Sequence, residues 1–185
     1  QRPPEHNFID KHVWDRLAEL GIPPSPIADD TSFLRRAFLD TIGTLPTPQE
    51  TRTFLTDKSA EKRAALITRL LQRKEYAQYW AMKWADILRV DKEIIKPVST
   101  IAMTRWLTEQ FANNVPYDQF VRKIVTVRGN TLSQSPAAFY LVHNDPEKLV
   151  RSVSQVFLGV RIECAQCHHH PFEKWSQADY AAFGG

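Results

Sequence analysis

Long hydrophobic runs, cysteine and methionine are all scarce in this chain of 185 residues. No apolar run approaches the roughly 18 residues that cross a bilayer, so we expect no membrane span. Two cysteines are too few for a framework of disulfides. No signal peptide is visible either, because the chain opens on the polar stretch QRPPEHNFID. We therefore expect a mature or excised piece from which any export signal has already been removed.

Blocks of a single charge are also missing. The 24 basic and 21 acidic residues are well mixed and leave a net charge of +3, and the basic groups are short pairs such as Arg35-Arg36. Nucleic-acid-binding proteins gather basic residues into a patch, so no nucleic-acid partner is expected. The content of 43% hydrophobic and 24% charged residues is typical of a globular domain and excludes general disorder.

Helical periodicity dominates what is present. Large apolar side chains recur at spacings of three and four residues, as in the stripe of Tyr76, Trp80, Trp84 and Leu88. Thr47-Pro48-Gln49-Glu50 has the pattern of a helix start, with a capping threonine, proline at the first position and glutamate at the third. Only RKIVTVRG is ambiguous between helix and strand. The sequence predicts an all-α fold.

The length and the spacing of these patterns predict a single domain of about seven to eight helices. Its first part, residues 1–30, holds an N-terminal helix and a proline-rich connector. A helical body covers residues 31–130. The last part, residues 137–185, carries both cysteines near its C-terminal end.

Both cysteines and three of the six histidines lie in one stretch, RIECAQCHHHPFEKW, which runs from Arg161 to Trp175. Cys164 and Cys167 are separated by two residues, and His168 follows directly. In c-type cytochromes this spacing lets two thiols form thioethers to the haem vinyl groups, while the adjacent histidine binds the iron. The use of both cysteines in one motif favours haem attachment.

Other chemistries of the same motif can be ranked. An iron–sulfur cluster normally takes four cysteines, and a thioredoxin-like dithiol belongs beside a βαβ pattern that is missing here. A zinc site needs a second pair of ligands, which the crowded His168, His169 and His170 supply poorly and to which His143 is a candidate contributor. From the residues alone, haem, a metal clip, and a disulfide or free thiols remain open.

Four blocks of the sequence resemble the planctomycete cytochrome-associated family of domains called DUF1549. They are FLRRAFLDTIGTLPTPQE (33–50), YWAMKWADILRV (79–90), NNVPYDQFVRKI (113–124) and FLGVRIECAQCHHHPFEKWSQADYAAF (157–183). Together they represent most of the chain from about Asp10 onward, and the last block is the most specific.

This resemblance implies one covalent haem c, attached through Cys164 and Cys167 with His168 as the proximal iron ligand. In the family's pattern, Cys-Ala-x-Cys-His-x-His-Pro-Phe, His170 and Phe172 also match. His169 stands at a variable position.

The remaining site residues follow from the haem hypothesis. We expect Phe172 and Trp175 to line the haem crevice, which would limit water at the iron. The sixth ligand is Met103, His143 or an open position. His170 is too close to His168 to reach the opposite face of a haem, so we expect it to hydrogen-bond near the group or to act as a ligand of a non-haem metal.

The resulting prediction is a mono-haem electron-transfer domain, rather than an enzyme, within a larger exported protein. Its partner would be a redox protein or a neighbouring domain such as DUF1553, which usually follows this family. Haem attachment implies a periplasmic or other extracytoplasmic location. One alternative is a structural module that binds zinc or iron through Cys164, Cys167 and His168 with His170 or His143. Another is a haem enzyme with an open distal site.

Overall fold

The fold was obtained as a computed structural model, which describes residues 2–185. Over these residues the chain forms α-helices and two 3₁₀ helices and no strand, which confirms the predicted all-α class. The elements are α1 (Phe8–Glu19), α2 (Asp30–Ile42), α3 (Pro48–Thr56), α4 (Lys62–Leu71), α5 (Lys74–Ile87), α6 (Pro97–Ala112), α7 (Tyr117–Val125), η1 (Ser135–Ala137), α8 (Ala138–Val142), α9 (Pro146–Leu158), η2 (Glu163–Gln166) and α10 (Gln177–Gly184).

The ten α-helices of the described chain are slightly more than the predicted seven to eight. Part of the difference is α8, which has five residues and is too short for side chains to repeat at helical spacing. The ambiguous stretch RKIVTVRG contributes the last residues of α7. Its apolar residues face the core of the molecule at helical spacing.

The helix ends follow local chemistry. Thr47 and Glu50 form the predicted capping box, in which each side chain accepts a hydrogen bond from the other residue's backbone N–H. Gly43 ends α2 in the left-handed conformation, with a φ of 71°. A Cβ at this position would also overlap the ring of Tyr79. Glycine is therefore required here both by the backbone and by the close approach of α5.

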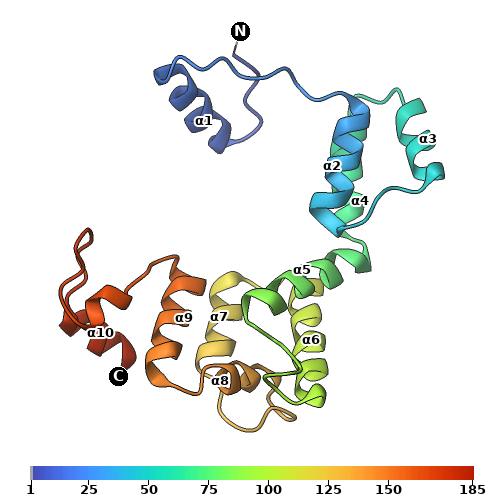
Figure 1. Ribbon diagram of the computed structural model, residues 1–185. Coiled ribbons are helices and arrows are strands. Elements are labelled where there is room, and N and C mark those ends of the chain that lie inside the picture. Colours follow the sequence, from blue (N-terminus) through green and yellow to red (C-terminus); the bar gives the residue numbers. More distant parts are fainter. Residues whose placement is uncertain (1) are drawn as a thin grey trace.

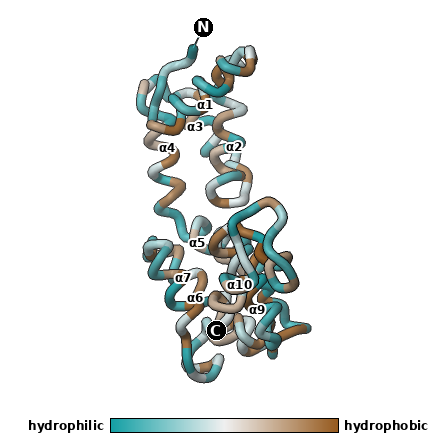
Figure 2. The backbone as a smooth tube through the Cα atoms, turned by 90° about the vertical axis from the view of Figure 1, so that its left-hand side faces the viewer, coloured by the Kyte–Doolittle hydropathy of each residue, from teal (hydrophilic) through white to brown (hydrophobic). Residues whose placement is uncertain are grey.

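Two hydrophobic cores form along the chain (Figure 1). The N-terminal core joins α2, α3 and α4, and its centre is Phe38, which is 1% exposed. The larger core belongs to the body formed by α5 to α9. Helix α5 joins the two, because Tyr76 packs against the N-terminal core while Ala81 lies inside the larger one. The tube of Figure 2 shows the same division into an upper and a lower group of helices.

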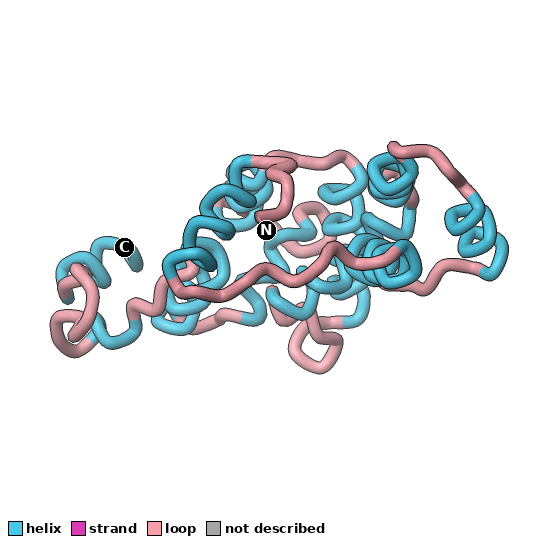
Figure 3. Tube along the Cα trace, turned by 90° about the horizontal axis from the view of Figure 1, so that it is seen from above, coloured by secondary structure: helices cyan, strands magenta, loops and turns pink. Residues whose placement is uncertain are grey.

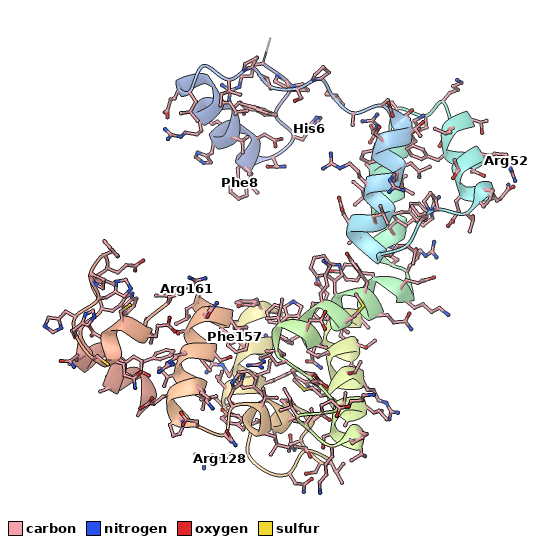
Figure 4. All side chains as sticks on the ribbon, viewed as in Figure 1. His6, Phe8, Arg52, Arg128, Phe157 and Arg161 are labelled. Atoms are coloured by element: carbon pink, nitrogen blue, oxygen red, sulfur yellow. The ribbon has the colours of Figure 1, made fainter. Side chains whose placement is uncertain are left out.

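Helix α1 stands apart from both cores. It has no buried residue, and the extended proline-rich connector that follows it crosses the molecule before α2 begins (Figure 3). Phe8 at its start is 78% exposed and projects from the end of the helix (Figure 4). Its own capping box, between Asn7 and Asp10, fixes the start of this helix, and Arg2 of the preceding segment pairs with Asp15 on its surface.

The C-terminal segment, residues 159–185, lies at one end of the body beyond α9 (Figures 1 and 3). It contains η2, an irregular loop and α10, and α10 has no fully buried residue. Over residues 2–185, no helix has both the length and the apolar character needed to cross a membrane, as the sequence predicted.

Candidate functional site

The two cysteines are presented by η2, directly after α9 ends. Gly159 ends α9 with a φ of 67°, and the chain then turns so that Ile162 and Ala165 are buried. Cys164 lies between these two buried residues, and Cys167 follows them. Both cysteines are exposed as free thiols. The burial of two apolar residues thus turns the sulfur atoms outward.

Backbone hydrogen bonds fix the spacing of the motif. The N–H groups of Cys167 and His168 both donate to the carbonyl oxygen of Cys164, at 3.3 and 3.2 Å. The side chain of Gln177, at the start of α10, donates to the carbonyl oxygen of Cys167 at 2.7 Å. A side chain of α10 therefore fixes the backbone position of the second cysteine.

The ring of His168 is set in one tautomer. Its Nδ1 lies 2.6 Å from the carbonyl oxygen of His169. A carbonyl oxygen only accepts hydrogen bonds, so Nδ1 must carry the proton. In the neutral ring Nε2 is then unprotonated and has a free lone pair. Histidines that bind metals through Nε2 are prepared in this way, by donation from Nδ1.

His170 is arranged differently. The backbone N–H of His170 donates to the carbonyl oxygen of Trp175 at 2.8 Å, and this bond closes the loop between the two residues. Its Nδ1 accepts a hydrogen bond from the N–H of Phe172 at 3.3 Å, so in the neutral ring the proton is on Nε2. This imidazole contributes to the shape of the loop, and neither nitrogen has a free lone pair in this arrangement.

An apolar cleft of about 310 Å³ lies between α9 and α10 and is lined by residues that precede and follow the cysteine motif. Trp175 lines it, as expected for a crevice residue, whereas the ring of Phe172 is 92% exposed and lies outside it. The hydroxyl of Tyr180 is buried there and has no hydrogen-bond partner among the described residues. The other residues that line the cleft are Ser154, Leu158, Val160, Ile162, Asp179, Ala182 and Phe183.

The two candidates for a sixth ligand lie elsewhere in the body. Met103 on α6 is fully buried in the larger core. His143, just after α8, is 8% exposed, and its Nε2 is 3.0 Å from the hydroxyl of Ser152. Burial, followed by the positive charge of Arg89, lowers the pKa of His143 below its usual value. Neither side chain lines the cleft that contains Trp175.

Several residues of the site were not predicted from the sequence. Gln177 is one of them, although it lies in the capping box that Ser176 and Asp179 form at the start of α10. Arg151 on α9 donates to the side chain of Gln166 at 2.7 Å and so attaches η2 to the body. The Gln177–Cys167 and Arg151–Gln166 contacts each join residues 10 or more positions apart, so no local sequence pattern predicts them.

The donor atoms of the motif do not converge on a point. Within the described part of the chain, no three side chains of His, Cys, Asp or Glu are grouped closely enough to hold a metal ion. A tetrahedral zinc site requires four donors within about 2.3 Å of the metal. Thioether formation instead needs two thiols that reach separate carbons and one imidazole that reaches the iron.

Comparison with known proteins relates the chain to one family. The model of the family PSCyt2, described as "Protein of unknown function (DUF1549)", matches residues 8–185. No curated protein and no solved structure matches the chain.

Proposed function

The chain belongs to the DUF1549 family, and from its own residues we propose that it attaches one haem covalently and transfers single electrons. Cys164 and Cys167 would form the thioethers, and His168 would bind the iron through Nε2. The observation that carries this proposal is the pairing of two free, exposed thiols with an adjacent imidazole whose Nδ1 already donates to a carbonyl.

The surroundings of the motif fit a large apolar group with polar edges. The cleft between α9 and α10 is lined by apolar side chains, including Ile162 and Trp175, which flank the cysteines in the sequence, although neither cysteine lines it. The buried hydroxyl of Tyr180 lacks a partner, which is uncommon in native proteins, and a bound group could supply the missing acceptor. The cleft therefore supports the proposal independently of the cysteine spacing.

A metal clip is less well supported by the same geometry. It would require Cys164, Cys167, His168 and either His170 or His143 to direct their donors toward one point. The lone pair of Nδ1 in His170 is occupied within its own loop, and His143 is hydrogen-bonded to Ser152. Forming such a site would require the histidine that joins it to be released from its present hydrogen bond.

The haem would supply a one-electron Fe(III)/Fe(II) couple, and the protein's residues would control its surroundings. The carbonyl of His169 orients the ring of His168, and Gln177 holds the peptide of Cys167. Apolar residues of the cleft exclude water, which favours the less charged form of the iron. The electron partner would be a redox protein or a neighbouring domain, in an extracytoplasmic compartment.

Expression with a cytochrome c maturation system tests the attachment. We expect a Soret band, a pyridine haemochrome spectrum, and colour that stays with the protein during acid extraction. The double substitution Cys164→Ser and Cys167→Ser should abolish all three, and His168→Ala should remove the normal axial ligation. His169→Ala is the matched control, because only the backbone carbonyl of this residue is used.

Electron transfer is tested on the coloured protein by a potentiometric titration. A reversible one-electron transition is expected. A colourless protein that binds one equivalent of zinc or iron would overturn the haem proposal. A coloured protein that reduces irreversibly and turns over a small substrate would overturn the electron-transfer role.

A further inference from the structure

A second cleft, of about 560 Å³, is lined by a different set of α9 residues from the apolar cleft between α9 and α10. It is formed by the end of α5, the end of α8 and the face of α9 that carries Ser152. Three cations line it, Arg89, Lys148 and Arg151, together with a single carboxylate, Glu163. With His143 neutral, the lining has an excess of two positive charges.

These cations are poorly neutralised by the protein itself. Among the described residues, Arg89 and Lys148 make no ion pair, and Arg151 has only a long contact of 3.6 Å with Glu147. Glu163 forms no ion pair with any of the three cations that share the cleft. Positive charges held together with too few counter-charges repel one another, so their arrangement favours an anion from outside.

Arg151 provides a second and independent observation. Its Nη2 donates to Gln166, but its Nε is buried and has no hydrogen-bond partner within residues 2–185. The buried Nε itself cannot reach a ligand in the cleft, but the side chain as a whole is 41% exposed and lines it. The accessible part of a guanidinium can present donors in one plane to an oxyanion. The exposed guanidinium and the excess charge point to the same type of ligand.

We propose that this cleft binds a small ligand that carries two or more carboxylate or phosphate groups. The rim cations Arg89 and Lys148 would attract it, and Arg151 would bind it from the half-buried side. Two sources share this chemistry. One is a diffusible polyanion, and the other is the pair of propionate groups on a haem attached at the neighbouring Cys164, which depends on the function proposed above.

Isothermal titration of the haem-free double variant Cys164→Ser, Cys167→Ser with citrate and with pyrophosphate tests the site without haem. At an ionic strength of about 0.01 M, where screening extends over about 30 Å, we expect saturable binding of one equivalent that weakens as salt is added. Arg89→Ala and Lys148→Ala should each weaken binding by up to about fivefold. Lys148→Glu should weaken it further.

Arg161→Ala is the matched control. This arginine is also exposed and close in sequence to the motif, but it projects away from α9 and does not line the cleft (Figure 4). Its removal lowers the net charge by the same amount and should leave the affinity unchanged. Circular dichroism on each variant verifies that the helices are retained.

Repeating the titration with haem-loaded protein separates the two sources. Unchanged affinity in the loaded protein would identify a diffusible anion as the ligand, whereas loss of binding on loading would place the haem carboxylates in the cleft. The absence of saturable binding to the haem-free variant, or an equal loss in Arg161→Ala, would overturn the site. Those results leave the spectroscopic test of haem attachment unaffected.

Discussion

The helical body and the C-terminal segment are built on different principles. In the body, Trp84 contacts four aromatic rings, with centroid distances from 4.9 Å to Phe120 to 6.4 Å to Phe111. In the segment after Gly159, only Ile162 and Ala165 are buried among the described residues, and Phe172 is almost fully exposed. A large aromatic core orders the first region, whereas two buried anchors and hydrogen bonds to the backbone order the second.

This difference means that stability and site geometry can be measured separately. Unfolding experiments report mainly the body, because the free energy of folding follows the apolar area that is buried. The arrangement of Cys164, Cys167 and His168 depends instead on a few hydrogen bonds whose loss opens the segment locally. Substitutions in the two regions should therefore change different observables.

The largest expected effect is that of Phe157→Ala. This side chain is 7% exposed and lies between α9 and α7, stacked on Trp84 and tilted against Phe139 (Figure 4). Removing it leaves a cavity, so the free energy of unfolding should fall by about 3–5 kcal/mol. Urea denaturation followed by circular dichroism measures the change.

Phe172→Ala makes the same substitution in the C-terminal segment. Its ring is 92% exposed, so the free energy of unfolding should change by less than about 0.5 kcal/mol. A comparable loss in both variants would show that the segment is part of the cooperative core, and the contrast between the regions would fail.

A smaller effect is expected where charges assist packing, at Arg73→Ala. This residue pairs with Glu50 of α3 and with Glu75 of α5, at 2.8 and 2.7 Å. Hydrogen bonding by Arg73 lowers the pKa of Glu75 to about 2, from an ordinary value of 4.5. Because these groups are about one-third exposed, the melting temperature at pH 7 should fall by only up to about 3 °C.

The sign of the pH dependence follows from the lowered pKa. The contribution of Glu75 is complete above pH 4.5 and is lost as the pH falls toward 2, because the folded state must then release the ion pair. The melting temperature of Arg73→Ala should depend less on pH over this interval. Arg52→Ala, an exposed arginine on α3 without an ion pair among the described residues, should behave like the unmodified protein (Figure 4).

How far the sequence determines this site depends on the range of the contacts. Local rules predicted the helical class, the capping box at Thr47, and the segment that contains the cysteines. They did not predict that Gln177 returns to Cys167, or that Arg151 reaches Gln166. Those contacts depend on where α9 and α10 end in space, which no periodicity encodes.

Gln177→Ala tests one of these contacts and should act only locally. The substitution removes the hydrogen bond to the carbonyl of Cys167, while Ser176 and Asp179 still cap α10. One hydrogen bond contributes about 1 kcal/mol, so amide exchange at Cys167 and His168 should accelerate by about fivefold. Global unfolding should be unchanged.

Gln155→Ala is the control for this experiment, because Gln155 is an exposed residue of α9 with no side-chain hydrogen bond in the described chain. It should leave amide exchange in η2 as it was. A fall in the global free energy of unfolding with Gln177→Ala would contradict a local role, since the contact would then belong to the cooperative core.

The smallest effect, and the most informative in sign, is expected for Tyr180→Phe. Its hydroxyl is buried without a partner, so its removal from the haem-free protein should leave the free energy of unfolding unchanged or raise it by up to about 1 kcal/mol. Tyr140→Phe is the matched substitution in the body. There the hydroxyl donates to the carbonyl of Val125 at 2.6 Å, and its loss should lower the free energy of unfolding by about 1 kcal/mol.

If Tyr180→Phe instead destabilises the haem-free protein as much as Tyr140→Phe does, the hydroxyl of Tyr180 already has a partner and no longer supports a bound group in the cleft. In haem-loaded protein the expectation reverses, and Tyr180→Phe should shift the reduction potential because a hydrogen bond beside the group is lost.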